Sequence, residues 1–185
     1  FETNSKMEVI KTPLKDCLII KTKMFGDDRG FFMESFNQQQ FLENGIDFEV
    51  KQINFAKSGK NVLRGLHFQK NPHAQTKLVG VISGAVLDVV VDMRKDSPTF
   101  KQTYRLKIES RDTFLLIPKG FAHGYYTLEE NTIFYYAVDN FYNPEAESGL
   151  IYNDKQLNID WGLIGLPLIS EKDLKQPAVD AAYTF

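Results

Sequence analysis

The residues best suited to catalysis lie in two neighbouring segments, residues 63–69 and 75–78. Arg64 carries a permanent positive charge, His67 is an imidazole that can act as a base, and Lys77 places a second cation ten residues after the histidine. A histidine base flanked by two cations is suited to a reaction in which a proton leaves carbon and negative charge builds up on oxygen. These segments therefore predict an acid–base site that also binds an anion.

Each of these residues also has a structural interpretation that needs no chemistry. His67 lies between apolar residues and resembles a core histidine, while Lys77 resembles the solvated end of a strand. Burying two cations around a histidine is unfavourable unless they bind an anion, so their combination favours function. His123 follows a turn at the start of a strand, where the two interpretations are evenly matched, and His73 is expected to be exposed and inert.

The three histidines raise the question of a bound metal ion. A metal site in a β-barrel typically has two histidines one residue apart on one strand face, with a carboxylate nearby. His67 and His73 are instead six residues apart across a proline, and His123 is remote from both. The chain also lacks a Gly-x-Gly-x-x-Gly motif after a strand. We therefore expect neither a metal ion nor a nicotinamide cofactor.

The composition limits the class of protein. Of 185 residues, 22 are basic and 24 acidic, and this net charge of −2 argues against nucleic acid binding. Cys17 is the only cysteine, so no disulfide can form within the chain and a reducing compartment fits best. No apolar run approaches the ~18 residues needed to span a membrane. We expect a cytoplasmic protein with no membrane partner.

The length of the chain fits one domain. Met7 resembles a native start, so we expect residues 1–6, which do not resemble a signal peptide, to be a cloning remnant or disordered. Residues 7–185 are then expected to form a single domain, because no internal repeat or long linker divides them.

Short β-strands are predicted along most of the chain. Fifteen Phe and eight Tyr favour strands over helices, and Gly and Pro mark turns between the apolar segments. Strands recurring every ~8–12 residues indicate a β-sandwich or barrel. Short helices are expected at 38–44, ending at Gly45, and after Ser170 as N-cap. The expected strands are a pair within 10–23, then 31–36, 50–55, 66–69, 77–83, 85–92, 104–108, 114–117, 124–127 and 132–138.

These elements must position several polar residues. The segment 86–92 is almost continuously apolar and is predicted as a central strand, so Asp88 within it needs a buried partner. Alternation along 132–138 points one of Tyr135 and Tyr136 inward, where a phenol in a polar cavity can act as a proton donor. Arg29 lies in a Gly-flanked turn, which usually means a surface position but also suits a phosphate contact.

In order and spacing, the segments of this chain resemble the dTDP-4-dehydrorhamnose 3,5-epimerase family from about residue 7 to about residue 177. The resemblance implies an all-β cupin fold (a double-stranded β-helix or jelly roll) with a few short peripheral helices, a homodimer, and no metal or organic cofactor. The matching segments are DRGFFME (28–34), QIN (52–54), LRGLH (63–67), QTKL (75–78), GAVLDVVVDMR (84–94), PKGFAHG (118–124), YNP (142–144), Trp161 and SEKD (170–173).

The resemblance also implies roles for individual residues. His67 would be the general base, Asp173 the carboxylate that orients it, Lys77 the group that stabilises the enolate oxygen, and Tyr136 the proton donor on the opposite face of the sugar. Tyr136 is selected over Tyr135 by counting back from the YNP segment. Residues implied to bind the substrate are Arg29 and Arg64 at the diphosphate, Lys172 nearby, Phe31, Glu34, Gln52, Asn54 and Tyr142 at the nucleoside and sugar, and Asp88 and His123 in the sugar pocket.

Two residues depart from the family pattern. Ala137 stands where many members have lysine, and Tyr125 stands where members usually have phenylalanine. Neither change removes a catalytic group, but both could reshape the pocket.

The function expected from the resemblance is epimerisation of a dTDP-linked 4-keto-6-deoxy sugar, from dTDP-4-dehydro-6-deoxy-D-glucose to dTDP-4-dehydro-L-rhamnose. A close alternative is an epimerase that inverts C3 only. Alternatives from other classes are a metal-dependent cupin and a nucleotide-sugar binding protein without catalytic activity.

Overall fold

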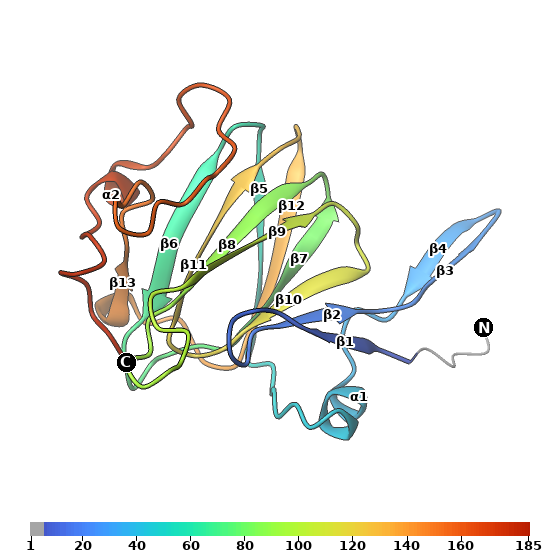
Figure 1. Cartoon of the computed structure of the whole chain (residues 1–185). Coiled ribbons are helices and arrows are strands. Elements are labelled where there is room, and N and C mark those ends of the chain that lie inside the picture. The colour runs from blue at the N-terminus through green and yellow to red at the C-terminus, as the bar shows by residue number, and fades with distance from the viewer. Residues whose placement is uncertain (1–5) are drawn as a thin grey trace.

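The computed structural model describes residues 6–185, which form two large antiparallel β-sheets and a separate hairpin (Figure 1). The sheets belong to a cupin-like jelly roll, as the sequence predicted. The six-stranded sheet has the order β1 (Glu8–Lys11), β2 (Leu18–Lys21), β10 (Thr113–Ile117), β7 (Lys77–Ser83), β12 (Thr132–Val138) and β5 (Gln52–Ser58). The five-stranded sheet has the order β13 (Glu147–Gly149), β6 (Leu63–Gln69), β11 (Phe121–Thr127), β8 (Val86–Asp92) and β9 (Thr103–Ile108).

Strand β8 has both faces buried, which explains its almost continuous apolar sequence. Val86 and Val90 point into the space between the two sheets, together with Phe134 from the opposite sheet. Val89 and Val91 point the other way and pack under the C-terminal segment, which includes Trp161. Each fully buried side chain of this size contributes roughly 1.5–3 kcal/mol relative to an exposed one.

Two short helices lie at the edges of the sheets, where the sequence predicted them. Helix α1 (Gln38–Glu43) begins at Asn37, whose side chain accepts a hydrogen bond from the backbone N–H of Gln40. Helix α2 (Glu171–Leu174) begins at Ser170, whose side chain accepts one from the backbone N–H of Asp173. Within residues 6–185, no helix is long and apolar enough to cross a membrane.

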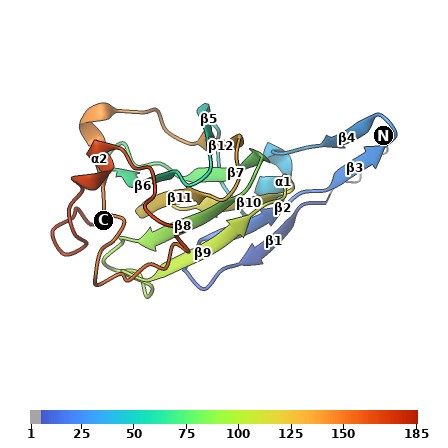
Figure 2. The ribbon, with the colours of Figure 1, turned by 90° about the horizontal axis from the view of Figure 1, so that it is seen from above.

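A two-stranded hairpin, β3 (Met24–Asp27) and β4 (Gly30–Met33), projects from the body of the molecule. Figures 1 and 2 both show it on the side opposite α2. The Gly-flanked turn predicted around Arg29 is the tip of this hairpin. The strand expected at 31–36 ends at Met33, and β3 was not predicted. A four-residue strand that contains glycine and has no buried side chain leaves no apolar alternation in the sequence.

Other strand boundaries also differ from the sequence prediction. Strands β6 and β11 begin three residues earlier than expected, at Leu63 and Phe121, because their first residues pair with neighbouring strands. Strand β13 (Glu147–Gly149) was not predicted at all. Its sequence Glu-Ser-Gly has no strand preference, and it is extended because it pairs with β6 at the edge of the sheet. Of the segment 1–6 that was set apart in the sequence, residues 1–5 lie outside the described residues.

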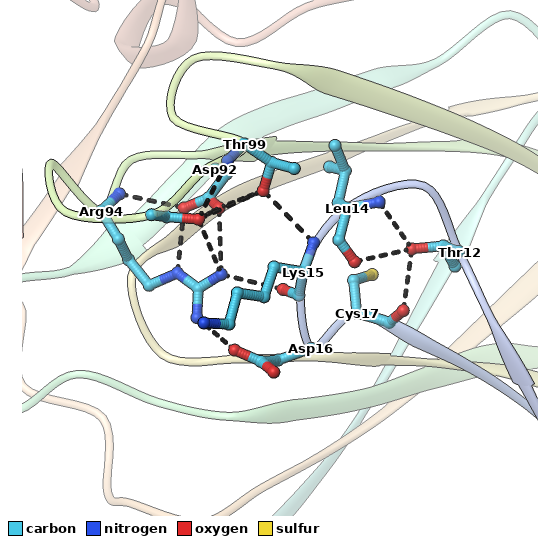
Figure 3. A network of polar contacts seen from close by, with 9 residues as sticks. Thr12, Leu14, Lys15, Asp16, Cys17, Asp92, Arg94 and Thr99 are labelled. Carbon is cyan, nitrogen blue, oxygen red and sulfur yellow. Dashed lines mark hydrogen bonds and ion pairs between the residues drawn. The ribbon is translucent and has the colours of Figure 1, made fainter.

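A polar network joins the loop after β8 to the loop between β1 and β2 (Figure 3). The guanidinium of Arg94 donates to Asp92 (Nε to Oδ1, 3.0 Å), to Asp16 (Nη1 to Oδ2, 2.9 Å) and to the carbonyl of Lys15 (Nη2 to O, 2.8 Å). The hydroxyl of Thr99 donates to Asp92 Oδ2 at 2.7 Å. Burial alone raises the pKa of Asp92, but hydrogen bonds led by those from Arg94 hold it below its ordinary value. The buried carboxylate is therefore ionised, and its hydrogen bonds with Arg94 and Thr99 help to hold the two loops together.

Candidate active site

A cavity of about 520 Å³ lies between the two sheets and is bordered by α2. It collects side chains from β6, β7, β11 and β12 and from α2, which are far apart in the sequence. The predicted site residues that line it are Arg64, His67, Lys77, His123, Tyr136, Lys172 and Asp173.

His67 and Asp173 form a hydrogen-bonded pair at the edge of this cavity. The distance from His67 Nε2 to Asp173 Oδ1 is 2.6 Å, and the second carboxylate oxygen accepts the backbone N–H of Gly65 at 3.1 Å. Burial raises the pKa of Asp173, but hydrogen bonds led by that from His67 bring it below the ordinary value, so the group is ionised. An ionised carboxylate is paired with the N–H of Nε2, which leaves Nδ1 of His67 as the proton acceptor.

The local backbone of β6 brings its site residues close to β11. Gly65 lies between Arg64 and His67 with φ of +120°, a conformation that disfavours other residues. A Cβ atom at position 65 would come within 2.5 Å of the Gly124 Cα atom. Glycine is therefore required here for the two strands to approach each other at the site.

Lys77 is the first residue of β7, and its ammonium is close to two acidic residues. Burial lowers its pKa to about 8, while the negative charges of Asp88 and Glu147 act in the opposite direction. Below about pH 8 the side chain is mainly a cation in a site of low dielectric constant. Such a cation can strongly stabilise a negative charge that develops on a nearby substrate oxygen.

The expectation that Asp88 has a buried partner is confirmed, and that partner is His123. His123 Nε2 lies 2.7 Å from Asp88 Oδ2, and both side chains are almost fully buried. Burial raises the pKa of Asp88, and the nearby His123 and Lys77 oppose this increase. Only His123 of the pair lines the cavity, and Asp88 adjoins the cavity through its contact with His123.

Tyr136 faces the cavity, and Tyr135 points to the other side of the sheet, as alternation requires. Burial raises the pKa of Tyr136, so its phenol keeps its proton at neutral pH and can serve as an acid. Tyr135 points outward but is not on the surface. It is only 7% exposed, because α1 and the following segment cover this face with Phe41 and Phe48.

A second cavity of about 320 Å³ shares His67, Lys77 and Tyr136 with the first and extends the site toward the edge of the sheets. Its other lining residues include Gln52, Asn54 and Tyr142, all predicted to contact the substrate. The side-chain oxygen of Gln52 accepts the backbone N–H of Tyr142 at 3.1 Å, and its amide donates to Asn54 at 3.0 Å. These three residues thus form one hydrogen-bonded wall.

Glu147 is a residue of this site that sequence reasoning did not identify. Its carboxylate accepts hydrogen bonds from Lys172 (2.6 Å) and from the Tyr142 hydroxyl (2.8 Å). Despite the effect of burial, these contacts, led by that with Lys172, lower its pKa, so it is an anion that faces His67 and Lys77. Its position in β13 carries no motif, and it could be found only through the pairing of β13 with β6.

Besides Asp88, three predicted substrate-binding residues lie outside both cavities. Arg29 is at the tip of the β3–β4 hairpin, with its side chain 77% exposed and paired with Asp27. Phe31 is 53% exposed on β4, and Glu34 accepts hydrogen bonds from Asn37 and Gln40 at the start of α1. Within one chain these residues are therefore not brought to His67.

His73 differs from the expectation of an exposed residue. It is half-buried, and its Nε2 lies 3.0 Å from the side-chain nitrogen of Asn143. Each histidine thus has its own partner: Asp173 for His67, Asn143 for His73 and Asp88 for His123. In the part of the chain that the structure describes, no three His, Cys, Asp or Glu side chains come together in a group that could hold a metal ion.

The two departures from the family pattern occupy different environments. Ala137 is fully buried on the outer face of β12, in the cluster of Phe41 and Phe48, and does not line the cavity. Tyr125 lines the cavity beside Arg64 and Tyr136. Of the two, only Tyr125 can contact a molecule bound there.

The arrangement can remove a proton from carbon and return one from another direction. His67 comes from the five-stranded sheet and Tyr136 from the six-stranded sheet, so a base and an acid approach from different sides. Lys77 supplies a cation for a developing oxyanion, and Arg64 and Lys172 supply positive charge for an anionic part of a substrate.

Comparisons with known proteins match almost the whole chain. A family model described as dTDP-4-dehydrorhamnose 3,5-epimerase matches residues 11–181. The chain is 48% identical over 178 residues to dTDP-4-dehydrorhamnose 3,5-epimerase from Salmonella typhimurium, covering 95% of this chain and 97% of the relative.

Solved structures agree with the sequence matches. A crystal structure of dTDP-4-dehydrorhamnose 3,5-epimerase from Elizabethkingia anophelis has a TM-score of 0.90 at 44% identity, covering 96% of this chain and all (100%) of the other. A crystal structure of dTDP-6-deoxy-D-glucose-3,5-epimerase from Legionella pneumophila, in complex with dTDP-4-keto-L-rhamnose, has a TM-score of 0.90 at 42% identity. The match covers 95% of this chain and 94% of the other.

Proposed function

Because this chain belongs to the dTDP-4-dehydrorhamnose 3,5-epimerase family, we propose that it converts dTDP-4-dehydro-6-deoxy-D-glucose to dTDP-4-dehydro-L-rhamnose. The protein is an isomerase that inverts C3 and C5, the two carbons next to the C4 ketone. The observation that carries the assignment of residues is the His67–Asp173 pair, 2.6 Å apart, in one cavity with Lys77 and Tyr136.

The proposed reaction begins with proton abstraction at a carbon next to the ketone. Nδ1 of His67 takes the proton, and the electron pair of the C–H bond moves through the carbonyl to leave an enolate. Such a C–H bond is a far weaker acid than imidazolium, so the enolate needs strong stabilisation, and the Lys77 ammonium supplies it at the oxygen. Tyr136 then donates its phenolic proton to the opposite face of the same carbon. Exchange with water restores both groups.

The anionic part of the substrate needs positive charge beside this centre. We assign the diphosphate to Arg64 and Lys172, because both line the cavity of His67 and both can make charge-assisted hydrogen bonds. Gln52, Asn54 and Tyr142 line the adjoining cavity and are assigned to the nucleoside. Asp88 and His123 form the buried floor beside Lys77.

A homodimer would bring the remaining predicted residues to the site. The β3–β4 hairpin projects away from its own body and carries Arg29 and Phe31 at or near its tip (Figures 1 and 2). Strand β5 is an edge of the six-stranded sheet, with Ile53 52% and Phe55 64% exposed on its outer face. We infer that the hairpin of one protomer packs near this edge of its partner and reaches the partner's cavity, where Arg29, Phe31 and Glu34 complete the nucleotide site. The lone Cys17 thiol favours a reducing compartment, and we place the enzyme in the cytoplasm.

Proton NMR of dTDP-4-dehydro-6-deoxy-glucose with the enzyme in D₂O tests this proposal. Deuterium is expected at both C3 and C5. The His67→Ala variant should bind dTDP normally and show no exchange, while His73→Ala, a change outside both cavities, should exchange like the wild type.

Other outcomes would reject parts of the proposal. Exchange at C3 alone would identify an epimerase of one centre. Near-normal exchange by His67→Ala would reject the base assignment. Full affinity for dTDP-glucose with no exchange by the wild type would favour a binding protein. Loss of exchange on chelation, with one metal ion per chain by elemental analysis, would favour a metal-dependent cupin.

A further inference from the structure

Tyr125 has a buried hydroxyl group at the wall of the cavity that holds His67. It lies on β11, directly opposite Arg64 on β6 and opposite Asp88 on β8. Its side chain lines the cavity although the residue is only 5% exposed. The residue therefore sits between the proposed diphosphate contact Arg64 and the buried floor of the site.

The hydroxyl of Tyr125 has no hydrogen-bond partner among residues 6–185. Ser58 lowers the pKa of the Tyr125 phenol as a hydrogen-bonding neighbour, but its contact with this hydroxyl falls short of full hydrogen-bond geometry. The Ser58 oxygen instead accepts two N–H groups of Arg64, each at 3.1 Å. Buried hydroxyls are rarely left unpaired, because burial removes their hydrogen bonds to water. An unpaired hydroxyl in the wall of a substrate cavity is therefore a group that a substrate can satisfy.

The hydroxyls of two other tyrosines near the site are paired, in contrast to that of Tyr125. The hydroxyl of Tyr126, the next residue of the same strand, donates to Asn61 Oδ1 at 2.5 Å. The hydroxyl of Tyr142 donates to Glu147 at 2.8 Å. Both hydroxyls are hydrogen-bonded within the protein, so neither is an unpaired group that a substrate could satisfy.

The ring of Tyr125 is held in a fixed position. It stacks on Phe134, with ring centres 3.9 Å apart and planes inclined by 19°. Burial raises the pKa of its phenol to about 12, despite the opposing charge of Arg64, so it keeps its proton across the physiological range. The ring is thus held by stacking, and its phenol is a protonated hydrogen-bond donor.

We propose that Tyr125 is a further substrate-binding residue, whose hydroxyl donates a hydrogen bond to an oxygen atom of the bound sugar. The sugar is favoured over the nucleoside because Tyr125 lines the cavity of His67 and Tyr136 but not the one lined by Gln52 and Tyr142. It is favoured over the diphosphate because Tyr125 also adjoins His123, with ring centres 6.4 Å apart, and His123 is paired in register with His67. This inference rests on the proposed function.

The test is the Tyr125→Phe variant, which removes one oxygen and keeps the stacked ring. Calorimetry would compare dTDP-glucose, which lacks the ketone and does not react, with dTDP. The affinity for dTDP-glucose should fall about three- to tenfold, as expected for one neutral hydrogen bond, and that for dTDP should not change. The melting temperature without ligand should be equal or higher, because an unpaired buried hydroxyl is removed.

Tyr126→Phe is the matched control, since it removes the hydroxyl of an adjacent tyrosine that does not line the cavity. It should lower the melting temperature and leave both affinities unchanged. Unchanged binding of dTDP-glucose by Tyr125→Phe would overturn the inference. An equal loss for dTDP and dTDP-glucose would also overturn it, because the contact would then be to the diphosphate. These binding results do not depend on turnover, so absent exchange by the wild type would reject the proposed function separately.

Discussion

At the scale of single residues, the proposed chemistry depends on which groups carry protons. Asp173 is an anion that fixes the ring of His67 through Nε2, and Tyr136 is a neutral phenol. Burial lowers the pKa of Lys77 to about 8, so the charge of this proposed oxyanion contact changes close to the physiological range.

Replacing Asp173 with Asn should affect the rate far more than binding. An amide can occupy the same space, but it no longer offers two acceptor oxygens to Nε2–H of His67 and to the backbone N–H of Gly65. The imidazole then loses its preferred tautomer and the stabilisation of its protonated form. We expect kcat to fall by roughly 10²–10⁴-fold, with KM for the 4-keto sugar within about threefold of the wild type. Steady-state kinetics measures both, and a change in KM alone would contradict the positioning role.

The activity should decline in mildly alkaline solution because Lys77 loses its charge. Burial lowers the pKa of this lysine to about 8, so the ammonium form is complete well below that pH and disappears as the pH rises through it. We expect kcat/KM to fall above about pH 8. In Lys77→Arg, which stays charged at any accessible pH, the remaining activity should persist to higher pH. A wild-type profile that stays flat to strongly alkaline pH would show that Lys77 does not act as a cation.

At the scale of elements, the site depends on loops and strand ends that hold the sheets in register. The network around Arg94 ties the loop after β8 to the loop between β1 and β2 (Figure 3). It lies away from the cavity, and none of its residues lines it. Its contribution should therefore be to stability.

Replacing Arg94 with Ala should destabilise the fold without impairing chemistry. The carboxylate of Asp92 has no exposed surface. Loss of the guanidinium leaves this buried charge with the backbone N–H of residue 94 and the hydroxyls of Ser97 and Thr99 as its hydrogen-bond donors. We expect the free energy of unfolding to fall by about 3 kcal/mol, measured by denaturant titration, while kcat of the folded enzyme is retained. Lys107→Ala is the control, since its pair with Glu109 is exposed on both sides and should change stability little. An equal loss of unfolding free energy in the two variants would show that the network does not stabilise the fold.

At the scale of the whole molecule, the question is whether one chain contains a complete site. The residues proposed for catalysis meet within one chain, but Arg29, Phe31 and Glu34 do not reach them. The hairpin that carries Arg29 lies on the side opposite α2 in both views (Figures 1 and 2). A site assembled from two copies accounts for both observations.

Mixed dimers provide a direct test of a shared site. His67→Ala damages the body of a protomer, and Arg29→Ala damages its hairpin. If the hairpin serves the partner's cavity, a dimer of the two variants has one site with both residues intact. Coexpression in equal amounts should then restore about one quarter of the wild-type activity, because half of the dimers are mixed and each has one intact site.

The two outcomes of this experiment differ clearly. If the hairpin served its own body, the mixed dimer would contain one site without His67 and one without Arg29, and no activity would return beyond that of the separate variants. Light scattering provides an independent check, and a monomer at working concentration would contradict the shared site.

Much of the fold and of the chemistry could be predicted from the sequence alone. Alternation, turn residues and helix caps act between residues that are close in the chain, so they indicated most strands of both sheets, both ends of α1 and the start of α2. The nearly continuous apolar run of β8 required a buried partner for Asp88. The order and spacing of short motifs pointed to the family, because such motifs consist of residue types at fixed positions along the chain.

Only the tertiary structure decided which of these groups meet and in what environment. His67 and Asp173 are 106 residues apart, and nothing local to either indicates a distance of 2.6 Å between their side chains. Glu147 joined the site through the pairing of an edge strand that has no strand-like sequence, and Tyr135 proved to be buried beneath α1. The lowered pKa of Lys77 and the unpaired hydroxyl of Tyr125 arise from burial by distant segments. Burial and long-range contact are properties of the folded chain, and the local pattern of residues does not contain them.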